Sequence, residues 1–317
     1  MTEMCRMILD VDTGIDDALA LFYAVRHPAI SLEAATTTYG NIDTDTATTN
    51  TLKILELLGA ANVPVSKGVD RAFIKPFHGG AKHVHGNNGI GDVDLPAPRA
   101  GVTGEHASDT IIRLAKEHPG ELTLCPVGPI TNVALALAKA PEIARLFRKV
   151  VIMGSAIAVP GVHGLPSPNA DPNWFNDPEA AHIVLTSGAD ITLVGLDVTM
   201  PTLLTTAMMD KVTQTGDHAA RTLMQITRFY VDAYETMYPG IGGCGLHDPL
   251  AVAIAQDPSL ATMERHHVAI ELHGELTRGN TVADRRSTAR HLHNADVCVD
   301  ADRPRFLSEF MRLLTES

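Results

Sequence analysis

The amino-acid sequence predicts an α/β fold, in which an open, mixed and mostly parallel β-sheet carries helices on both faces, as in Rossmann-like folds. Apolar runs of strand length alternate with helical patterns along the chain. Polar stretches of unusual composition follow several of the predicted strands. No composition shift, low-complexity tract, linker or internal repeat divides the sequence, so we expect a single domain over residues 1–317.

The alternation begins near the N-terminus. Residues 7–11 form a short apolar run that predicts a buried strand, and the run ALALFYAV predicts a helix over residues 17–26. Residues 32–40 are rich in Thr and predict the second strand, because β-branched residues favour extended backbone. Leucines near helical spacing predict a helix over residues 43–58, and a short third strand follows over residues 63–68.

A long loop interrupts the pattern at residues 68–104, where Gly, Pro, His and Asn are frequent. Loops of this length inside compact domains are usually functional. The alternation then resumes with a helix over residues 108–117, a strand over 121–125, a helix over 131–139 and a strand over 149–154.

A second long loop, residues 155–176, is rich in Pro, Gly and Asn. It ends at Asp177, which predicts a helix N-cap because Pro178 follows at the first helical position. The remaining predicted elements are a strand at residues 189–197, a mostly helical stretch over 202–237, a helix over 247–255, strands at 266–272 and 296–300, and a last helix over 305–314.

Composition excludes several classes of partner. The net charge of −12 argues against nucleic acid or an anionic membrane surface. The N-terminal apolar stretch is too short for a secretory signal, and no segment approaches the roughly 20 apolar residues that span a bilayer. The cysteines are scattered and form no CxxC pair, which indicates reduced thiols in a cytoplasmic protein and argues against a zinc site through cysteine. They are Cys5, Cys125, Cys244 and Cys298.

The stretch DVDTGIDD places four aspartates within eight positions, directly after the first predicted strand; they are Asp10, Asp12, Asp16 and Asp17. Like charges at this spacing repel each other unless something positive compensates them. A hard divalent cation is the simplest compensation, since calcium accepts roughly six to eight oxygen ligands. Helix capping would explain only one or two of the four aspartates.

Two other kinds of aspartate-rich site fit less well. An EF-hand loop needs Gly at its sixth position and an acidic residue at its twelfth, and Ile15 and Leu21 occupy those positions here. A DxD phosphotransferase fits poorly because Asp16 and Asp17 lie directly behind the Gly14 turn. A metal site therefore remains the favoured interpretation.

The polar stretches that follow predicted strands are DVDTGIDD, TTTYGN, CPVGPITN, IMGSA and the loop before NDPEAA. Open α/β sheets bind ligands outside the carboxyl ends of their strands, so we expect these stretches to share one pocket. GLHDPLAVA adds His247 and Asp248 at a helix start, where a cap is the simpler alternative. HVHGNNGIGD offers imidazoles and amides, where a solvated loop is the alternative.

Seven stretches together resemble the nucleoside hydrolase family of inosine–uridine-type N-ribohydrolases: DVDTGIDDALAL, TTTYGN, HGNNGIGD, PVGPITNVALAL, IMGSA, NDPEAA and GLHDPLAVA. The resemblance runs from Asp10 to about Ala255 in the family's order. It implies an open α/β fold, a nucleoside substrate, one Ca2+ ion at the bottom of the pocket, and a homodimer or homotetramer. The implied reaction hydrolyses the N-glycosidic bond of ribonucleosides to free base and ribose.

The resemblance also implies roles for single residues. The implied calcium ligands are Asp12, Asp17, Asp248 and the backbone carbonyl of Val127. The implied substrate contacts are Asp16 and Asn173 on ribose hydroxyls, Asn41 beside the metal and the reacting centre, Met153 below the sugar, and His85 and His247 near the base. The predicted catalytic residues are Asp12, His247 and Asn41.

These residue types suit the chemistry. Cleavage makes the sugar resemble an oxocarbenium ion, which carboxylates below the ring stabilise. The implied calcium would lower the pKa of a water molecule, so that Asp12 can deprotonate it. The imidazole of His247 supplies a proton to the departing base. We expect Asp10 to support the loop through hydrogen bonds.

The loop before NDPEAA departs from the family pattern. Val162 stands where a Gly-Asn step is common, and in the family that amide contacts the ribose 5′-hydroxyl. Asn169 or His163 could replace it, or the substrate could lack a normal 5′ group. Asp171 stands where Glu is usual, so we expect it to reach the 3′-hydroxyl differently or through water.

Four aromatic residues remain. Trp174 lies just before a predicted helix, which favours packing over stacking on a base. Tyr230, Tyr234 and Tyr238 are four residues apart on a helical stretch. We assign Tyr230 to a half-buried helix face and leave the other two tyrosines open.

Three functions are compatible with these residues. The first is a calcium-dependent nucleoside N-ribohydrolase. The second keeps the fold and metal but acts on an N-riboside with an altered 5′ end. The third is a non-catalytic nucleoside- or ribose-binding protein, which the complete metal set and His247 disfavour. The sequence does not rank purine against pyrimidine bases, because loops 68–100 and 225–245 decide that choice.

Overall fold

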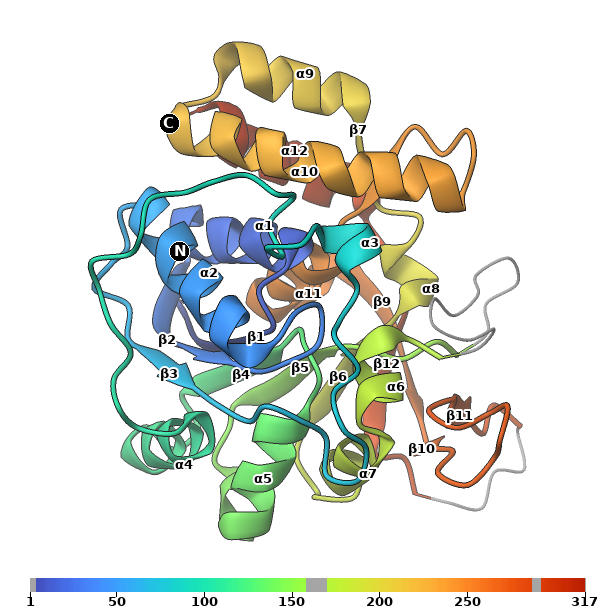
Figure 1. Cartoon of the computed structure of the whole chain (residues 1–317). Coiled ribbons are helices and arrows are strands. Elements are labelled where there is room, and N and C mark those ends of the chain that lie inside the picture. The colour runs from blue at the N-terminus through green and yellow to red at the C-terminus, as the bar shows by residue number, and fades with distance from the viewer. Residues whose placement is uncertain (1–3, 158–169, 287–291, 317) are drawn as a thin grey trace.

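The computed structural model describes residues 4–157, 170–286 and 292–316, and an eight-stranded sheet forms its centre (Figure 1). The strands lie in the order β3-β2-β1-β4-β5-β6-β12-β9. Every neighbouring pair is parallel except β12 and β9. The predicted mixed, mostly parallel sheet is therefore confirmed. Its strands are β1 (Cys5–Val11), β2 (Ile30–Thr37), β3 (Val65–Lys67), β4 (Leu122–Pro126), β5 (Lys149–Met153), β6 (Ile191–Val194), β9 (Ala261–His266) and β12 (Ala295–Ala301).

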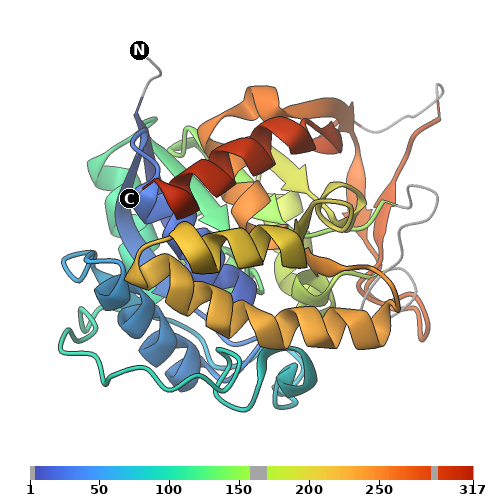
Figure 2. The same cartoon turned by 90° about the horizontal axis from the view of Figure 1, so that it is seen from above.

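Helices cover both faces of the sheet, as Figure 1 shows. Strand β1 illustrates the reason, because successive side chains of a strand point to opposite faces. Met7 and Leu9 join one apolar cluster and Ile8 joins the other. The first cluster includes residues of α1 (Ile15–Arg26), α2 (Thr44–Leu57), α9 (Thr206–Thr215), α10 (His218–Met237), α11 (His247–Gln256) and α12 (Arg303–Thr315). The second includes residues of α4 (Ala107–Glu117), α5 (Thr131–Lys139) and α7 (Pro178–Leu185). Figure 2 shows α9, α10 and α12 side by side over the first face.

The strand order reverses between β1 and β4. From β1 the chain proceeds to β2 and β3 on one side, whereas β4, β5 and β6 follow on the other. Connections that diverge in this way leave a crevice at the carboxyl ends of the two strands. Asp10 of β1 lies beside Pro126 of β4, so Asp12 and Val127 emerge next to each other. The fold therefore places the aspartate-rich stretch where open α/β sheets bind ligands.

Several short elements differ from the sequence-based expectation. β7 (Leu203–Thr205) pairs antiparallel with β8 (Gly243–Gly245), although residues 202–237 are predicted to be mostly helical. Residues 266–272 are not one strand; β9 ends at His266, and β10 (Val268–Ile270) pairs with β11 (Thr281–Ala283) in a separate small sheet. Elements of three to five residues are too short for a periodic pattern. The other short elements are α3 (Lys82–His85), η1 (Pro141–Arg145), α6 (Pro172–Asn176), α8 (Leu196–Thr199) and η2 (Pro258–Leu260).

Two global features complete the fold. Across residues 4–157, 170–286 and 292–316, no helix is long and apolar enough to cross a membrane. All four cysteines are buried and free, in agreement with the expected reduced thiols.

Candidate active site

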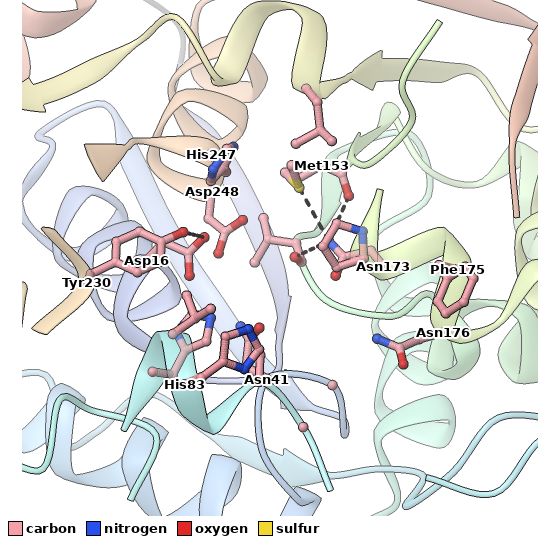
Figure 3. A pocket seen from close by; sticks show the side chains of 18 of the residues that line it. Asp16, Asn41, His83, Met153, Asn173, Phe175, Asn176, Tyr230, His247 and Asp248 are labelled. Atoms are coloured by element: carbon pink, nitrogen blue, oxygen red, sulfur yellow. Dashed lines mark hydrogen bonds between the residues drawn. The ribbon is translucent and has the colours of Figure 1, made fainter. Parts of the chain in front are cut away.

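A cavity of about 340 Å³ opens at the carboxyl ends of β1, β4 and β5, with α3, α6 and α10 in its wall (Figure 3). Asp12 and Asp17 are buried directly behind this wall, where each accepts a hydrogen bond from Asn41. Asn169, Val162 and His163 lie outside the described residues. Most of the predicted site residues line the cavity, namely Asp16, Asn41, His85, Val127, Met153, Asn173, His247 and Asp248.

Three carboxylates converge beside the cavity. One oxygen each of Asp16, Asp17 and Asp248 lies within 4.8 Å of the other two. Asp16 and Asp17 come from the first turn of α1, and Asp248 comes from the first turn of α11. These two helices pack against each other, so their N-terminal ends bring the acidic residues together. Helix N-termini favour negative charge, which offsets part of the mutual repulsion.

Asp17 acts as a helix cap, which is the alternative to a metal ligand that the sequence left open. Its Oδ1 accepts a hydrogen bond from the Asp12 amide at 3.0 Å, and its Oδ2 accepts one from the Gly14 amide at 2.9 Å. The Asn41 side-chain amide also donates to Oδ2 at 3.0 Å. Backbone capping therefore accounts for the conformation of Asp17 but not for its clustering with Asp16.

Two features of the site fit a divalent cation: buried carboxylate oxygens without a hydrogen-bond partner among the described residues, and a donor set made of oxygen atoms. Oδ1 of Asp12 and Oδ1 of Asp16 are buried and have no hydrogen-bond partner among the described residues. A buried, unpaired carboxylate oxygen is costly unless a charge compensates it. The donors at hand are all oxygen atoms, the ligand type that calcium prefers. The residues present therefore fit a hard divalent cation.

The pKa values of these carboxyl groups reflect the same crowding. Burial, followed by the charge of Asp17, raises the pKa of Asp12 well above its usual range and raises the pKa of Asp16 to about 7. Burial and the neighbouring aspartates also raise the pKa of Asp248 strongly. Protein groups alone thus disfavour full ionisation of the cluster, and a bound cation would favour it.

Two glycines enclose the Asp12 carboxylate. A Cβ atom on Gly40 would lie 2.0 Å from Oδ2, and a Cβ atom on Gly128 would lie 2.7 Å from Oδ1. Gly40 also has a φ of +154°, which other residues rarely adopt. The Asn41 amide completes the enclosure by donating to Oδ2 at 2.6 Å. The carboxylate is therefore fixed in one orientation.

Asp10 supports the floor of the site, as the sequence predicts. Its Oδ1 accepts hydrogen bonds from Thr36 Oγ1 at 2.6 Å and from Asn132 Nδ2 at 2.9 Å. Its backbone carbonyl accepts a hydrogen bond from the Val127 amide at 2.8 Å. These bonds tie the end of β1 to the loop that follows β4.

Helix α6 presents Asn173 to the cavity. Its Nδ2 donates to the Val127 carbonyl at 2.7 Å. Asp171 caps this helix, because its Oδ1 accepts a hydrogen bond from the Trp174 amide at 2.8 Å. Its Oδ2 accepts a hydrogen bond from the Ser155 amide, also at 2.8 Å. Asp171 is fully buried and is not among the described residues that line the cavity. Its contact with the sugar therefore stays a prediction.

Trp174 follows Asp171 but points away from the cavity into the second apolar cluster, where it is fully buried. A Cβ atom on Gly154 would lie 2.0 Å from the indole nitrogen, so the ring packs tightly against the end of β5. The predicted packing role of Trp174 is confirmed.

A second group of side chains faces the carboxylates from α10 and α11. The Tyr230 hydroxyl donates to Asp16 Oδ2 at 3.4 Å, and the Tyr234 hydroxyl lies 2.5 Å from Nε2 of His247. The assignment of Tyr230 to a half-buried helix face is wrong, because this residue is buried in the cavity wall. The four-residue spacing already placed Tyr230 and Tyr234 together, but it could not show which way that face points. Tyr238 caps α10 and does not line the cavity among the described residues.

His85 closes the site from the long loop. Its Nδ1 accepts a hydrogen bond from the Ile15 amide at 3.1 Å, and its ring centroid lies 5.3 Å from that of Tyr230. Burial lowers the pKa of His85 to about 3, so the ring is neutral. The sequence reasoning gave no role to several further lining residues, among them Phe77, His83, Phe175, Asn176, Leu196 and Met237, although His83 and Asn176 begin the stretches HVHGNNGIGD and NDPEAA.

Residues 7–308 match the family described as inosine-uridine preferring nucleoside hydrolase. The chain belongs to this family. The inosine-uridine preferring nucleoside hydrolase of Leishmania major is 39% identical over 304 residues, which cover 95% of this chain and 94% of that protein. The pyrimidine-specific ribonucleoside hydrolase RihA of Enterobacter sp. (strain 638) is 34% identical over 301 residues, or 95% of each chain. The solved structure of a purine-preferring ribonucleoside hydrolase from Gardnerella vaginalis matches with a TM-score of 0.92, at 41% identity and over 98% of each chain.

Family membership settles the reaction class. The chain is a hydrolase that acts on the N-glycosyl bond of ribonucleosides. The same comparisons confirm the nucleoside hydrolase fold. The names of the relatives include both purine-preferring and pyrimidine-specific enzymes, so membership fixes the bond but not the base.

Proposed function

We propose that the chain is a calcium-dependent nucleoside N-ribohydrolase that releases free base and ribose. The observation that carries this proposal is the cluster of Asp16, Asp17 and Asp248 with the buried Asp12 nearby, since Oδ1 of Asp12 and Oδ1 of Asp16 have no hydrogen-bond partner among the described residues. The ion would be held by Asp12, Asp17, Asp248 and the Val127 carbonyl. When bound, calcium supplies positive charge that compensates the carboxylates and lowers the pKa of the attacking water.

Asp12 acts as the general base in this proposal. Its Oδ2 is engaged by the Asn41 amide, which leaves Oδ1 without a partner among the described residues and able to accept a proton from water. The glycine enclosure holds that oxygen in one direction, and fixed geometry is what a general base needs. Asn41 contributes by orienting Asp12 and Asp17.

Asp16 and Asn173 bind the ribose hydroxyls, with Met153 below the sugar. All three line the cavity, and Asn173 is positioned by its bond to Val127. As the glycosidic bond breaks, positive charge develops on the sugar, and the carboxylates of Asp12 and Asp16 stabilise it.

The leaving base receives its proton from the side of the cavity formed by His247 and Tyr234. Their 2.5 Å contact joins a phenol to an imidazole, two groups that donate and accept protons. Burial raises the pKa of Tyr234, so an unassisted tyrosinate is unfavourable and the imidazole is needed beside it. His85 contacts the base from the opposite loop.

Base release from a panel of purine and pyrimidine nucleosides tests the proposal. We expect release that EGTA abolishes and added Ca2+ restores. Asp12→Ala should lose at least about a hundredfold in kcat, since general base catalysis contributes roughly 10²–10⁴-fold. Asp232→Asn removes an equal charge from an exposed position on α10 and serves as the control. A fully active Asp12→Ala variant, or release that chelation leaves unchanged, would contradict the proposal.

A riboside with an altered 5′ end is a second candidate substrate. The sequence supports it through Val162, which stands where the family's 5′-hydroxyl contact is common, and both oxygens of the neighbouring Asp171 accept backbone N–H groups of Ser155 and Trp174. Comparing kcat/KM for inosine and 5′-deoxyinosine tests it, and a preference for inosine above about tenfold would exclude it. A cytoplasmic location and a homodimer or homotetramer stay predictions.

A further inference from the structure

Thr199 uses its hydroxyl differently from two other buried threonines, Thr202 just after α8 and Thr227 in α10. Thr202 and Thr227 donate to the carbonyl four residues earlier, at 2.8 and 2.7 Å. The Thr199 hydroxyl instead lies 2.7 Å from Nδ1 of His247, and it has no other partner among the described residues. Thr199 is fully buried at the end of α8, so solvent does not compete for this bond.

This contact determines where the imidazole of His247 carries its hydrogen. An uncharged imidazole has a single N–H group, and here Nδ1 faces the Thr199 hydroxyl at 2.7 Å while Nε2 faces the Tyr234 hydroxyl at 2.5 Å. If Nδ1 carried it, Nδ1 would donate to Thr199, and the buried threonine hydrogen would lack an acceptor among the described residues, which is costly. If Nε2 carries it, Thr199 donates to Nδ1 and both groups are satisfied.

We propose that Thr199 is a positioning residue that holds His247 in the Nε2–H tautomer, with its one ring hydrogen directed at Tyr234. The proposal deepens the proposed function and rests on it. The Tyr234 oxygen then accepts a hydrogen bond from the ring, and its own hydrogen, which otherwise has only the long contact to Met200 Sδ at 4.0 Å and the Tyr230 hydroxyl at 3.4 Å, can donate toward the leaving base. With the opposite tautomer, the Tyr234 hydrogen would be committed to Nε2.

The surrounding backbone fixes the positions of Thr199 and His247 relative to each other. Leu203 pairs with Gly245 across β7 and β8, and the Leu246 amide donates to the Thr202 carbonyl at 2.8 Å. These bonds fix the segment after α8 against the start of α11. A Cβ atom on Gly245 would lie 2.7 Å from Nε2 of His247, so the ring fits closely over this glycine. Thr199 thus contacts a ring whose position is already narrowly defined.

Nitrogen NMR on the calcium-supplemented protein tests the tautomer directly. The protein is labelled with [15N]histidine, and His247→Gln identifies the signals of this ring. We expect Nδ1 to have the chemical shift of an unprotonated nitrogen and Nε2 that of a protonated one. The same pattern should persist in Thr199→Ser and in the control Thr202→Val, because the Thr202 hydroxyl donates to the Val198 carbonyl of α8 and not to His247. A protonated Nδ1 in the wild type would overturn the proposal, whether or not any variant folds.

Kinetics test the consequence. We expect Thr199→Val to lower kcat on inosine and uridine by about 10–100-fold, by analogy with the loss of the partner that orients a metal-binding histidine, with KM nearly unchanged. The loss should be much smaller on 4-nitrophenyl riboside, whose leaving group departs without a proton, and Thr199→Ser should restore activity. An equal loss on all three substrates, or no loss, would contradict a positioning role. A wild type inactive on nucleosides would refute the proposed function instead, while the NMR pattern still decides the tautomer.

Discussion

Gly128→Ala provides a sharp test of how closely the Asp12 carboxylate is held. The added Cβ would lie 2.7 Å from Oδ1 and 3.0 Å from Cγ of Asp12, whereas ordinary contacts begin at 3.4 Å. The carboxylate must therefore move by roughly 0.4–0.7 Å. Gly128 does not have a left-handed φ, so its backbone accepts alanine and the strain falls on Asp12.

The displacement should reduce activity much more than stability. The 2.6 Å bond from the Asn41 amide resists the movement, so Asp12 loses either this bond or its alignment. A misplacement on the order of 1 Å costs about a hundredfold in rate, and we expect a loss between about 10-fold and 100-fold in kcat/KM. Overpacking should lower the free energy of unfolding by about 1–3 kcal/mol.

The assay combines base release with urea unfolding and calcium titration of the same preparations. Gly101→Ala is the matched control, because its added Cβ would meet no atom within 4 Å. We expect this control to match the wild type in every measurement. A Gly128→Ala variant with wild-type kcat/KM and wild-type calcium affinity would show that the Asp12 position is not critical.

Three further predictions concern the cation, a buried cap and the single tryptophan. Calcium at about 100–1,000 times its Kd should stabilise the fold by about 3–4 kcal/mol, seen as a rise in Tm that EGTA reverses; an unchanged Tm would contradict a cation site. Burial raises the pKa of Asp171 to about 7 from 3.8, so its contribution to stability is present below pH 4 and is lost as the pH rises toward 7. The free energy of unfolding of Asp171→Asn should therefore rise relative to the wild type by about 2–3 kcal/mol between pH 5 and pH 8 in urea titrations, and a pH-independent difference would refute this. Trp174→Phe should lower the free energy of unfolding by about 1–3 kcal/mol while the KM stays within twofold, whereas a tenfold rise in KM would indicate stacking on the base.

The location of the site follows from local sequence and one rule of the fold. The apolar run before Asp10 marks one buried strand, and a second apolar run before Val127 marks another. Because both strands are parallel neighbours, their carboxyl ends meet, and the motifs after them share one pocket. The resemblance of these motifs to a family then supplied roles for single residues, which composition and periodicity could not provide.

The residues that sequence reasoning misjudged or did not consider depend on contacts between distant elements. Tyr230 has the spacing of a packing residue, and only the path of α10 beside α1 directs its hydroxyl to Asp16. Thr199 belongs to no motif, and only the pairing of β7 with β8 brings it to His247. Hydroxyl groups leave little trace in a hydrophobic pattern, so their partners emerge only from tertiary structure.

The aspartate cluster is explained by how its oxygens are used. Both oxygens of Asp17 accept N–H groups, so this residue would hold its place at the start of α1 in any protein with that turn. Asp12 and Asp16 each keep one buried oxygen without a partner among the described residues, and burial together with the charge of Asp17 raises the pKa of both. A fold selected for stability alone would place an apolar or a neutral polar side chain at such positions. The free-energy cost of burying these unpaired oxygens is understandable if they bind a cation and stabilise positive charge on a sugar. Only an unpaired and fixed carboxylate can do either.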